Sequence, residues 1–327
     1  MKYRKLGKTG YNVSEISLGT WQVGGKWGEE FNKENADRIL NQAADKGINF
    51  IDTADVYGNG LSEQAVGRLI KSRSERIYIA TKCGRRIQPH NIENYTVKAL
   101  RSSVEDSLKN IGIEKIDIIQ LHCPPPEAYN RPEIFELFNR LKEEGKIENL
   151  GVSVQKVDEA LKSIEYPNVT TIQIIFNMFR LKPAEHFFKE AFKKDTGIIV
   201  RVPLASGLLT GRYSRETKFS SGDHRSFNRD GKFFDKGETF SGIDYEKGIE
   251  AVEELKNIFP GEEMAIIALK WILMFREVSV IIPGASRPDQ VLTNLKAITA
   301  PELEQKQMMA VQDIYNKYFR ESVHKSW

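Results

Sequence analysis

Short apolar runs alternate with segments of helical spacing along almost the whole chain. Each apolar run is followed by a segment whose apolar residues recur every three or four positions. Strands that alternate with helices form parallel βαβ units. Eight such units in a chain of 327 residues predict a closed (β/α)8 TIM barrel, and no G-x-G-x-x-G sequence follows the first strand to suggest an open dinucleotide-binding sheet. The predicted strands are a short one ending at Gly19 and residues 48–52, 77–81, 116–121, 147–153, 171–176, 198–202 and 278–282.

Three segments lie outside the repeating units. Residues 2–14 contain two alternating runs around a turn and predict an N-terminal hairpin, and residues 301–319 predict a C-terminal extra helix. Residues 205–242 show no period and form a long loop after the seventh strand. Loops of this length are typical of active-site lids, and an irregular surface excursion is the alternative. We expect residues 1–327 to form a single domain.

The composition excludes several classes of function. Hydrophobic residues make up 40% and charged residues 28% of the chain, which is typical of a protein with a large core. The net charge is only +3 and the basic residues are scattered, so we expect no nucleic-acid partner. No apolar run has the length of a membrane span, and no apolar signal segment follows the basic start. Two cysteines cannot build a disulfide framework or a four-cysteine metal site, and a cytoplasmic location is expected.

Polar side chains stand where three consecutive predicted strands end. Asp52, Lys82 and His122 occupy these ends, and Tyr57 lies in the loop after the first of them. In a (β/α)8 barrel the carboxyl ends of the strands meet at one face, where catalytic groups collect. Each residue alone also fits a role without chemistry: Asp52 as a turn cap, Tyr57 as a packing residue, Lys82 at the rim, and His122 in the core. Together they predict one site.

These four residue types suit the reduction of a carbonyl group. A free tyrosine has a pKa near 10 and is a poor acid at neutral pH. A lysine ammonium about 4 Å away favours the phenolate by roughly 4 kcal/mol, about three pKa units, at an effective dielectric constant near 20. Asp52 would hold Lys82 protonated, and His122 would donate a hydrogen bond to the carbonyl oxygen while Tyr57 protonates it. No side chain donates hydride, so a cofactor is required.

The motifs around these residues resemble the aldo-keto reductase family, in its bacterial branch. GINFIDTADVYGNGLSEQAVG, IATK and DIIQLH stand in the family's order and spacing, and the resemblance covers nearly the whole chain. It implies that Asp52, Tyr57, Lys82 and His122 form a catalytic tetrad. It also implies NADPH as the cofactor, with NADH less expected, bound extended across the carboxyl face of the barrel without a Rossmann fold.

Further positions match the family's coenzyme-binding residues. The resemblance implies that Gly19, Thr20 and Trp21 lie at the nicotinamide end and that Ser153 and Gln173 hold the carboxamide. PLASGLLTG resembles the loop over the pyrophosphate, and IIPGASRPDQVLTN resembles the adenosine end with its 2′-phosphate. The coenzyme residues from these two segments are Pro203, Leu204, Ser206, Gly207, Leu209, Gly284, Ser286, Arg287, Gln290 and Asn294.

The sequence departs from the family pattern beside the expected nicotinamide. Arg201 stands where many members carry an aromatic residue that stacks on the ring, and a planar guanidinium can also stack. Val154 replaces an asparagine that would contact the carboxamide, and Cys123 replaces a frequent tryptophan, which makes the pocket wall smaller. The expected substrate residues are Trp21, Trp27, Tyr57, His122 and Cys123, with Met178 and Phe179 either in this wall or in the core.

The sequence thus predicts an NADPH-dependent oxidoreductase that reduces aldehydes or ketones to alcohols. One alternative is an NAD(P)-dependent sugar or polyol dehydrogenase, because the fold does not fix the substrate. Another is a cofactor-binding regulatory subunit similar to the channel-associated members of the family. The expected partner is a small-molecule carbonyl compound, without nucleic acid, membrane or metal, and the protein is expected to be a monomer or a weak homo-oligomer.

Overall fold

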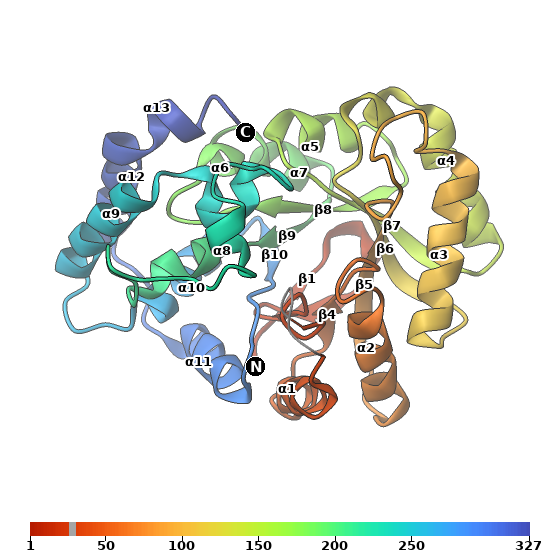
Figure 1. Cartoon of the computed structure of the whole chain (residues 1–327), viewed down its shortest axis with the longest axis horizontal. Helices are drawn as coiled ribbons and strands as arrows, with labels where there is room; N and C mark the ends of the chain where they lie inside the picture. The colour runs from red at the N-terminus through yellow and green to blue at the C-terminus, as the bar shows by residue number, and fades with distance from the viewer. Residues whose placement is uncertain (26–30) are drawn as a thin grey trace.

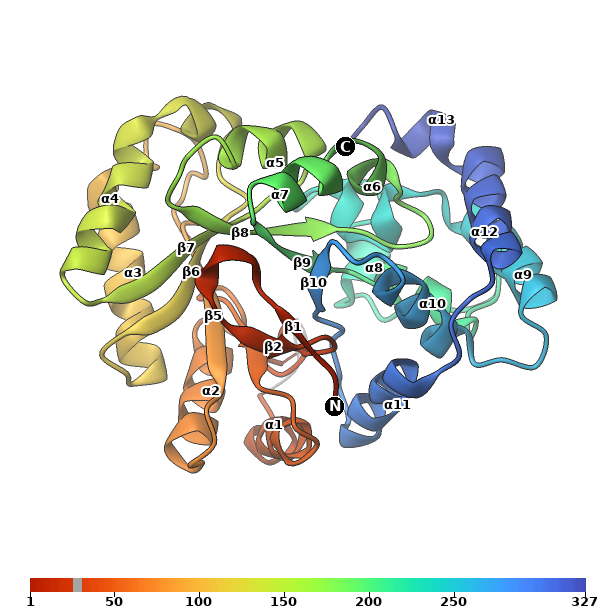
Figure 2. The same cartoon turned by 180° about the vertical axis from the view of Figure 1, so that it is seen from behind.

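The computed structural model describes residues 1–25 and 31–327, and its centre is a barrel of eight parallel strands (Figure 1; Figure 2). Each strand pairs with the next one in chain order from β3 to β10. Two single parallel bridges, Ile16 to Ile281 and Gly19 to Gly284, join the first strand to the last. The predicted (β/α)8 barrel is confirmed. Its strands are β3 (Leu18–Gly19), β4 (Phe50–Asp52), β5 (Tyr78–Cys83), β6 (Ile116–His122), β7 (Ile147–Ser153), β8 (Val169–Ile175), β9 (Gly197–Arg201) and β10 (Val278–Ile281).

Helices occupy the connections and cover the outside of the barrel (Figure 1). Asn32 and Thr96 begin two of them by accepting a backbone hydrogen bond from the first turn. In the described part of the chain, none of the helices has both the length and the apolar character of a membrane span. The longer helices are α1 (Lys33–Asp45), α2 (Leu61–Lys71), α3 (Val97–Ile111), α4 (Pro132–Glu143), α5 (Val157–Ser163), α9 (Tyr245–Ile258), α10 (Met264–Leu273), α11 (Pro288–Thr299) and α12 (Gln305–Tyr318). The shorter ones are α6 (Lys182–His186), α7 (Phe188–Lys193), α8 (His224–Phe227) and α13 (Arg320–Val323).

The helices differ from the sequence prediction in two places. The sequence pattern of residues 184–195 predicts a single helix, but the structure breaks it into α6 and α7 at Phe187, whose side chain is fully buried. The sequence analysis does not predict α9, although Tyr245, Ile249 and Val252 recur at helical spacing and are buried in the structure. Two helices, α9 and α10, therefore precede the last strand.

The long segment, residues 205–242, is not a structureless loop. It contains α8 and three 3-10 turns, η3 (Ala205–Thr210), η4 (Lys236–Glu238) and η5 (Phe240–Gly242). One-turn helices are too short to show an apolar period, so the sequence predicted only a loop here.

The N-terminal hairpin closes the amino end of the barrel. β1 (Tyr3–Lys5) and β2 (Asn12–Ser14) pair antiparallel, as predicted. Leu6 and Val13 are fully buried and belong to the group of apolar side chains that fills the barrel interior beside Phe50. With this end plugged by apolar residues, polar side chains collect at the carboxyl end.

A larger apolar core lies between the strands and the surrounding helices. Met178 and Phe179 are 1% and 0% exposed and belong to this core, where the ring of Phe179 packs 4.7 Å from that of Phe319. Packing, rather than a substrate wall, is the role that the structure gives these two residues.

Arg4 ties the hairpin to the last unit of the barrel. Its guanidinium donates to the carbonyl oxygens of Leu273, Phe275 and Val278 at 2.7, 3.2 and 2.8 Å, and it pairs with Glu15 at 3.0 Å. These carbonyls lie at the end of α10 and the start of β10, where the helix leaves backbone acceptors without a helical partner. The arginine therefore joins the N-terminal hairpin to the segment that contains the last strand.

Candidate active site

The three polar strand ends and Tyr57 come together at the carboxyl end of the barrel. Asp52 and His122 are the last residues of β4 and β6, and Lys82 is the penultimate residue of β5. Each of the three is at most 7% exposed. Lys82 Nζ donates to Asp52 Oδ1 at 2.5 Å and to Tyr57 Oη at 3.3 Å. The rings of Tyr57 and His122 meet edge to face with their centroids 6.2 Å apart.

Lys82 is held protonated between Asp52 and Tyr57. Its ammonium also donates to the carbonyl oxygen of Thr53 at 2.8 Å, so all three N–H groups have acceptors. Burial opposes the charge, but Asp52 and Tyr57 outweigh it and raise the pKa of Lys82 above its ordinary value. Lys82 is therefore a fixed positive charge beside the Tyr57 hydroxyl.

Two glutamine amides orient the carboxylate of Asp52. Its Oδ2 accepts hydrogen bonds from Gln120 Nε2 at 2.9 Å and from Gln173 Nε2 at 2.7 Å, and Gln173 Nε2 also donates to Gln120 Oε1 at 3.0 Å. Gln120 is not among the site residues that the sequence motifs predict. Its position could have indicated this role. It lies two residues before His122 on the same strand, and alternate residues of a strand point to the same side.

Burial decides the protonation of Tyr57 and His122. Burial raises the pKa of Tyr57 and Lys82 lowers it by less, so that the pKa lies above its ordinary value. The lowering expected from the ammonium is present, but burial outweighs it, and Tyr57 keeps its proton. Burial and the positive charges of Arg85 and Lys82 hold the pKa of His122 well below its ordinary value, so its ring is neutral. Among the described residues, its Nδ1 atom has no hydrogen-bond partner.

Gly19 and Thr20 lie at the seam of the barrel, where the first strand meets the last. Gly19 pairs with Gly284, and a Cβ atom at Gly19 would lie 2.7 Å from the carbonyl oxygen of Ile282, so a larger residue does not fit. The backbone N–H and Oγ1 of Thr20 both donate to the carbonyl oxygen of Asp52 at 2.9 Å. Both residues thus fix the backbone beside the tetrad.

Trp21 and Cys123 lie at the same end of the barrel. The ring of Trp21 is 4.6 Å from the ring of His224 in α8, so the long segment reaches over the site. Cys123 directly follows β6, and its Sγ atom lies 3.9 Å from Ser153 Oγ. Trp27, the other expected wall residue, lies outside the described residues.

The predicted pyrophosphate segment folds into a tight turn after β9. Val202, Ala205 and Ser206 have positive φ angles of 52°, 46° and 54°, followed by Gly207 at 98°. Such angles are uncommon for residues with a side chain and cluster at functional sites. Ser206 Oγ donates to the carbonyl oxygen of Glu238 at 3.2 Å, which ties the start of the long segment to its later part. Pro203, Leu204 and Leu209 belong to the same turn.

The predicted adenosine residues gather at the start of α11. Gln290 Oε1 accepts from the backbone N–H of Ser286 at 2.7 Å and from its Oγ at 3.1 Å. Asn294 Nδ2 donates to the carbonyl oxygen of Gly284 at 3.5 Å. The exposed Arg287 pairs with the nearby Asp289. No hydrogen bond from the N-cap side chain closes the start of α11, and a helix N-terminus suits a phosphate.

An ion cluster that the sequence analysis did not identify lies beside the tetrad. Glu238 Oε1 faces Arg85 Nη1 at 3.0 Å and Arg201 Nη1 at 3.8 Å. Arg201 also donates to the carbonyl oxygen of Val154 at 3.0 Å. Burial alone raises the pKa of Glu238, but the two guanidinium groups lower it below its ordinary value, so Glu238 is ionised. No local pattern signals this contact, because Arg85 and Glu238 are far apart in the sequence.

The residues at this end of the barrel fit a nicotinamide dinucleotide. His122 Nδ1 is a buried polar atom without a partner among the described residues. The start of α11 suits a phosphate, and the strained turn after β9 leads into the long segment. The tetrad can move a proton but holds no hydride donor, which such a coenzyme supplies.

Comparison with known proteins identifies the family. The sequence model of the Aldo/keto reductase family matches residues 15–316. The chain is 31% identical to aldo-keto reductase YhdN from Bacillus subtilis over 89% of this chain and 87% of that protein. Two solved structures share the fold with a TM-score of 0.79. They are aldo-keto reductase AKR11C1 from Bacillus halodurans (26% identity, 99% of both chains) and glycerol dehydrogenase AKR11B4 from Gluconobacter oxydans (29% identity, 97% of this chain and 96% of that one).

The names of other relatives differ in cofactor and role. An NADH-specific methylglyoxal reductase from Escherichia coli is 29% identical over 91% of this chain and 94% of its own. The aldo-keto reductase yakc [NADP(+)] from Schizosaccharomyces pombe is 27% identical over 90% and 86%. A putative voltage-gated potassium channel subunit beta from the same yeast is 31% identical over 90% and 88%. The chain belongs to the Aldo/keto reductase family, whose oxidoreductases use nicotinamide cofactors in carbonyl reduction.

Proposed function

We propose that the protein reduces aldehydes or ketones to alcohols with NADPH and that Tyr57 is the general acid. The observation that carries this proposal is the position of the Lys82 ammonium, bonded to Asp52 on one side and 3.3 Å from Tyr57 Oη on the other. Asp52 offsets the cost of burying this cation, and the cation lies where it would stabilise a phenolate at Tyr57. The neutral His122 beside it completes a set that can bind a carbonyl oxygen.

Each residue of the set has a separate task. The coenzyme, when bound, supplies the hydride that adds to the carbonyl carbon and is itself oxidised to NADP⁺. His122 donates a hydrogen bond to the carbonyl oxygen, which gains negative charge as the C=O double bond opens. Tyr57 transfers its proton to this oxygen, and Lys82 stabilises the phenolate that remains. Asp52, held by the two glutamine amides, keeps Lys82 protonated and in place.

The residues at the N-terminus of α11 support the proposed preference for NADPH. Arg287 lies next to the first turn, where a helix N-terminus and a guanidinium suit a 2′-phosphate. The relatives named for NADH and for NADP(+) show that the family uses both coenzymes, so direct measurement must decide. A second candidate function is the oxidation of polyols, in which the same residues catalyse the reverse reaction. The similarity to the solved structure named as a glycerol dehydrogenase favours this candidate. We also predict that the protein is cytoplasmic and consists of a single domain.

The test is the variant Tyr57→Phe, assayed by coenzyme oxidation with a panel of aldehydes. Removing the general acid should lower turnover by about 10²–10⁴-fold while the NADPH dissociation constant stays close to that of the wild type. The matched control is Tyr78→Phe, because the ring of Tyr78 stacks on Tyr11, at the other end of the barrel, and should not affect turnover. Near-normal turnover in Tyr57→Phe would remove Tyr57 from the acid role.

A further inference from the structure

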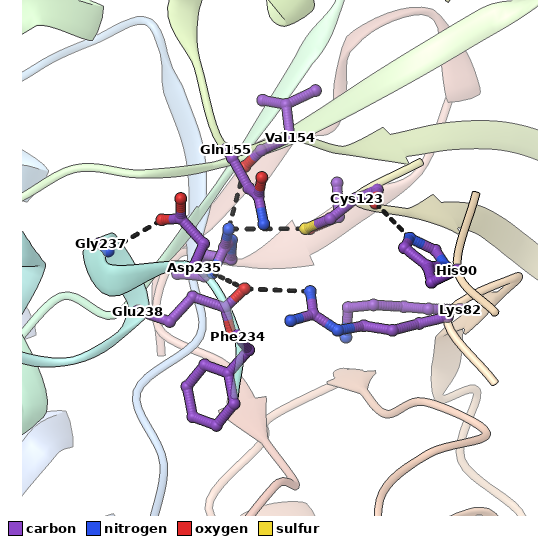
Figure 3. Close-up of polar contacts among 12 residues, drawn as sticks. Lys82, His90, Cys123, Val154, Gln155, Phe234, Asp235, Gly237 and Glu238 are labelled. Atoms are coloured by element: carbon purple, nitrogen blue, oxygen red, sulfur yellow. Dashed lines mark hydrogen bonds and ion pairs between the residues drawn. The ribbon is translucent and has the colours of Figure 1, made fainter. Parts of the chain in front are cut away.

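Two guanidinium groups and only one carboxylate lie beside the tetrad. The side chains of Arg85, Arg201 and Glu238 are 20%, 11% and 18% exposed. Within the described residues, Glu238 is the only carboxylate within 4.0 Å of either guanidinium. Figure 3 shows the Glu238 carboxylate directed toward the side of the site where Lys82 and Cys123 lie. The two guanidinium groups and the single carboxylate therefore leave the cluster with a net charge of one positive unit.

Unused donors accompany this surplus charge. Arg201 Nε is buried and has no hydrogen-bond partner among the described residues. Arg201 Nη2 donates to one carbonyl oxygen and otherwise faces the Cys123 thiol at 3.7 Å, a weak acceptor. Buried donors and charges without partners destabilise a protein, and they are retained where a ligand supplies the partner.

The cluster lies within the reach of a small substrate bound at the tetrad. Cys123, which Arg201 contacts, directly follows His122, and Arg85 is three residues after Lys82. The charges of the coenzyme are expected elsewhere, at the turn after β9 and at the start of α11. The surplus charge therefore faces the part of the site that the substrate would fill.

We propose that Arg85 and Arg201 bind a carboxylate group carried by the carbonyl substrate, so that the preferred substrates are aldehyde or keto acids. This inference rests on the proposed function. A monoanionic carboxylate balances the single surplus charge, whereas a phosphate dianion would leave a negative excess. Two guanidinium groups offer the paired N–H donors that a planar carboxylate accepts.

Glu238 partly neutralises the arginines before the substrate arrives. It comes from η4 in the long segment, so it also holds this segment against Arg85 in the loop after β5 and against Arg201 at the end of β9. A substrate carboxylate competes with Glu238 for the same donors or joins it between them. In either case, removal of the Glu238 charge strengthens the attraction for an anionic substrate.

The test compares aldehydes that differ only in a carboxylate: succinic semialdehyde against butanal, and para-carboxybenzaldehyde against benzaldehyde. In the wild type, kcat/KM should be at least about tenfold higher for the acid of each pair, which corresponds to about 1.4 kcal/mol. Arg85→Gln should bring this ratio close to one, Arg85→Lys should keep part of it, and Glu238→Gln should increase it. Arg76→Gln is the matched control, because Arg76 precedes the same strand at its other end and pairs with Asp117.

Binding of benzoate to the protein with bound NADP⁺, measured by calorimetry, gives a readout without turnover. The wild type and Arg76→Gln should bind benzoate at least about tenfold more tightly than Arg85→Gln. Equal kcat/KM values within each pair, or equal benzoate binding by Arg85→Gln and Arg76→Gln, would refute the carboxylate site and leave the proposed function intact. Benzoate binding without Tyr57-dependent reduction of any aldehyde would instead refute the proposed function.

Discussion

Asp55 carries a buried carboxyl group whose ionisation should make the protein less stable as the pH rises. It lies in the turn after β4, is 1% exposed, and neither carboxylate oxygen has a hydrogen-bond partner among the described residues. Burial, with a smaller contribution from the nearby Glu63, raises the pKa of Asp55 to about 7. The perturbation that we consider is Asp55→Asn, which keeps the shape and removes the charge.

The magnitude follows from the two pKa values. The unfolded chain has an aspartate pKa of about 3.9, so between pH 4 and pH 7 the folded protein binds more protons than the unfolded one. Stability due to this group is therefore complete below about pH 4 and falls as the pH rises to about 7. The cost to folding is about 1.5 kcal/mol at pH 5 and about 4 kcal/mol at pH 8, a difference of about 2.5 kcal/mol.

The assay is urea unfolding of the wild type and of Asp55→Asn at about pH 5 and pH 8. The stability advantage of the variant should be about 2–3 kcal/mol larger at the higher pH. Asp313→Asn serves as the control, because Asp313 is exposed on α12 and meets water in both states. An advantage that is the same at both pH values, to within about 0.5 kcal/mol, would refute a buried proton on Asp55.

Three other predictions test separate parts of the structure. Arg287→Ala should weaken NADPH binding about ten- to a hundredfold and leave NADH nearly unchanged in titrations with both coenzymes, and an equal loss for both would place Arg287 on their shared part. Cys83 and Cys123 are buried free thiols, so thiol titration of the unfolded protein without reductant should detect both, and a result of none would reveal a bridge. Gly67→Ala should lower the free energy of unfolding by about 1–3 kcal/mol, because its Cβ atom would lie 2.0 Å from the carbonyl oxygen of Ile111 in α3, and unchanged stability in urea would contradict this contact.

The sequence predicted the tetrad because its signals are local. Asp52, Lys82 and His122 each stand at the end of an apolar run, and the barrel topology alone brings such ends together. The direction of the pKa shift of Tyr57 was not predictable from the same residues. It depends on how completely the surrounding chain buries the phenol, which a list of neighbouring charges does not contain.

The missed features depend on contacts between distant segments. Arg85 and Glu238 meet only because the long segment returns over the barrel, and their separation of 153 positions leaves no pattern to read. The helix α9 is a different case. Its apolar residues have helical spacing, but they follow directly on the aperiodic segment that ends near residue 242, which obscured the start of the helix.

The seam of the barrel has a consequence for the order in which the chain can fold during synthesis. Every strand from β4 to β10 can pair with the preceding strand once it has left the ribosome, but the first strand gains its second neighbour only when the last strand has been made. Until then β3 and the newest strand both present unpaired edges, which attract other chains. The hydrogen bonds of Arg4 also form late, because their acceptors lie at the end of α10 and the start of β10. A nascent chain arrested shortly before Val278 therefore still presents both edges and leaves Arg4 without its full set of acceptors.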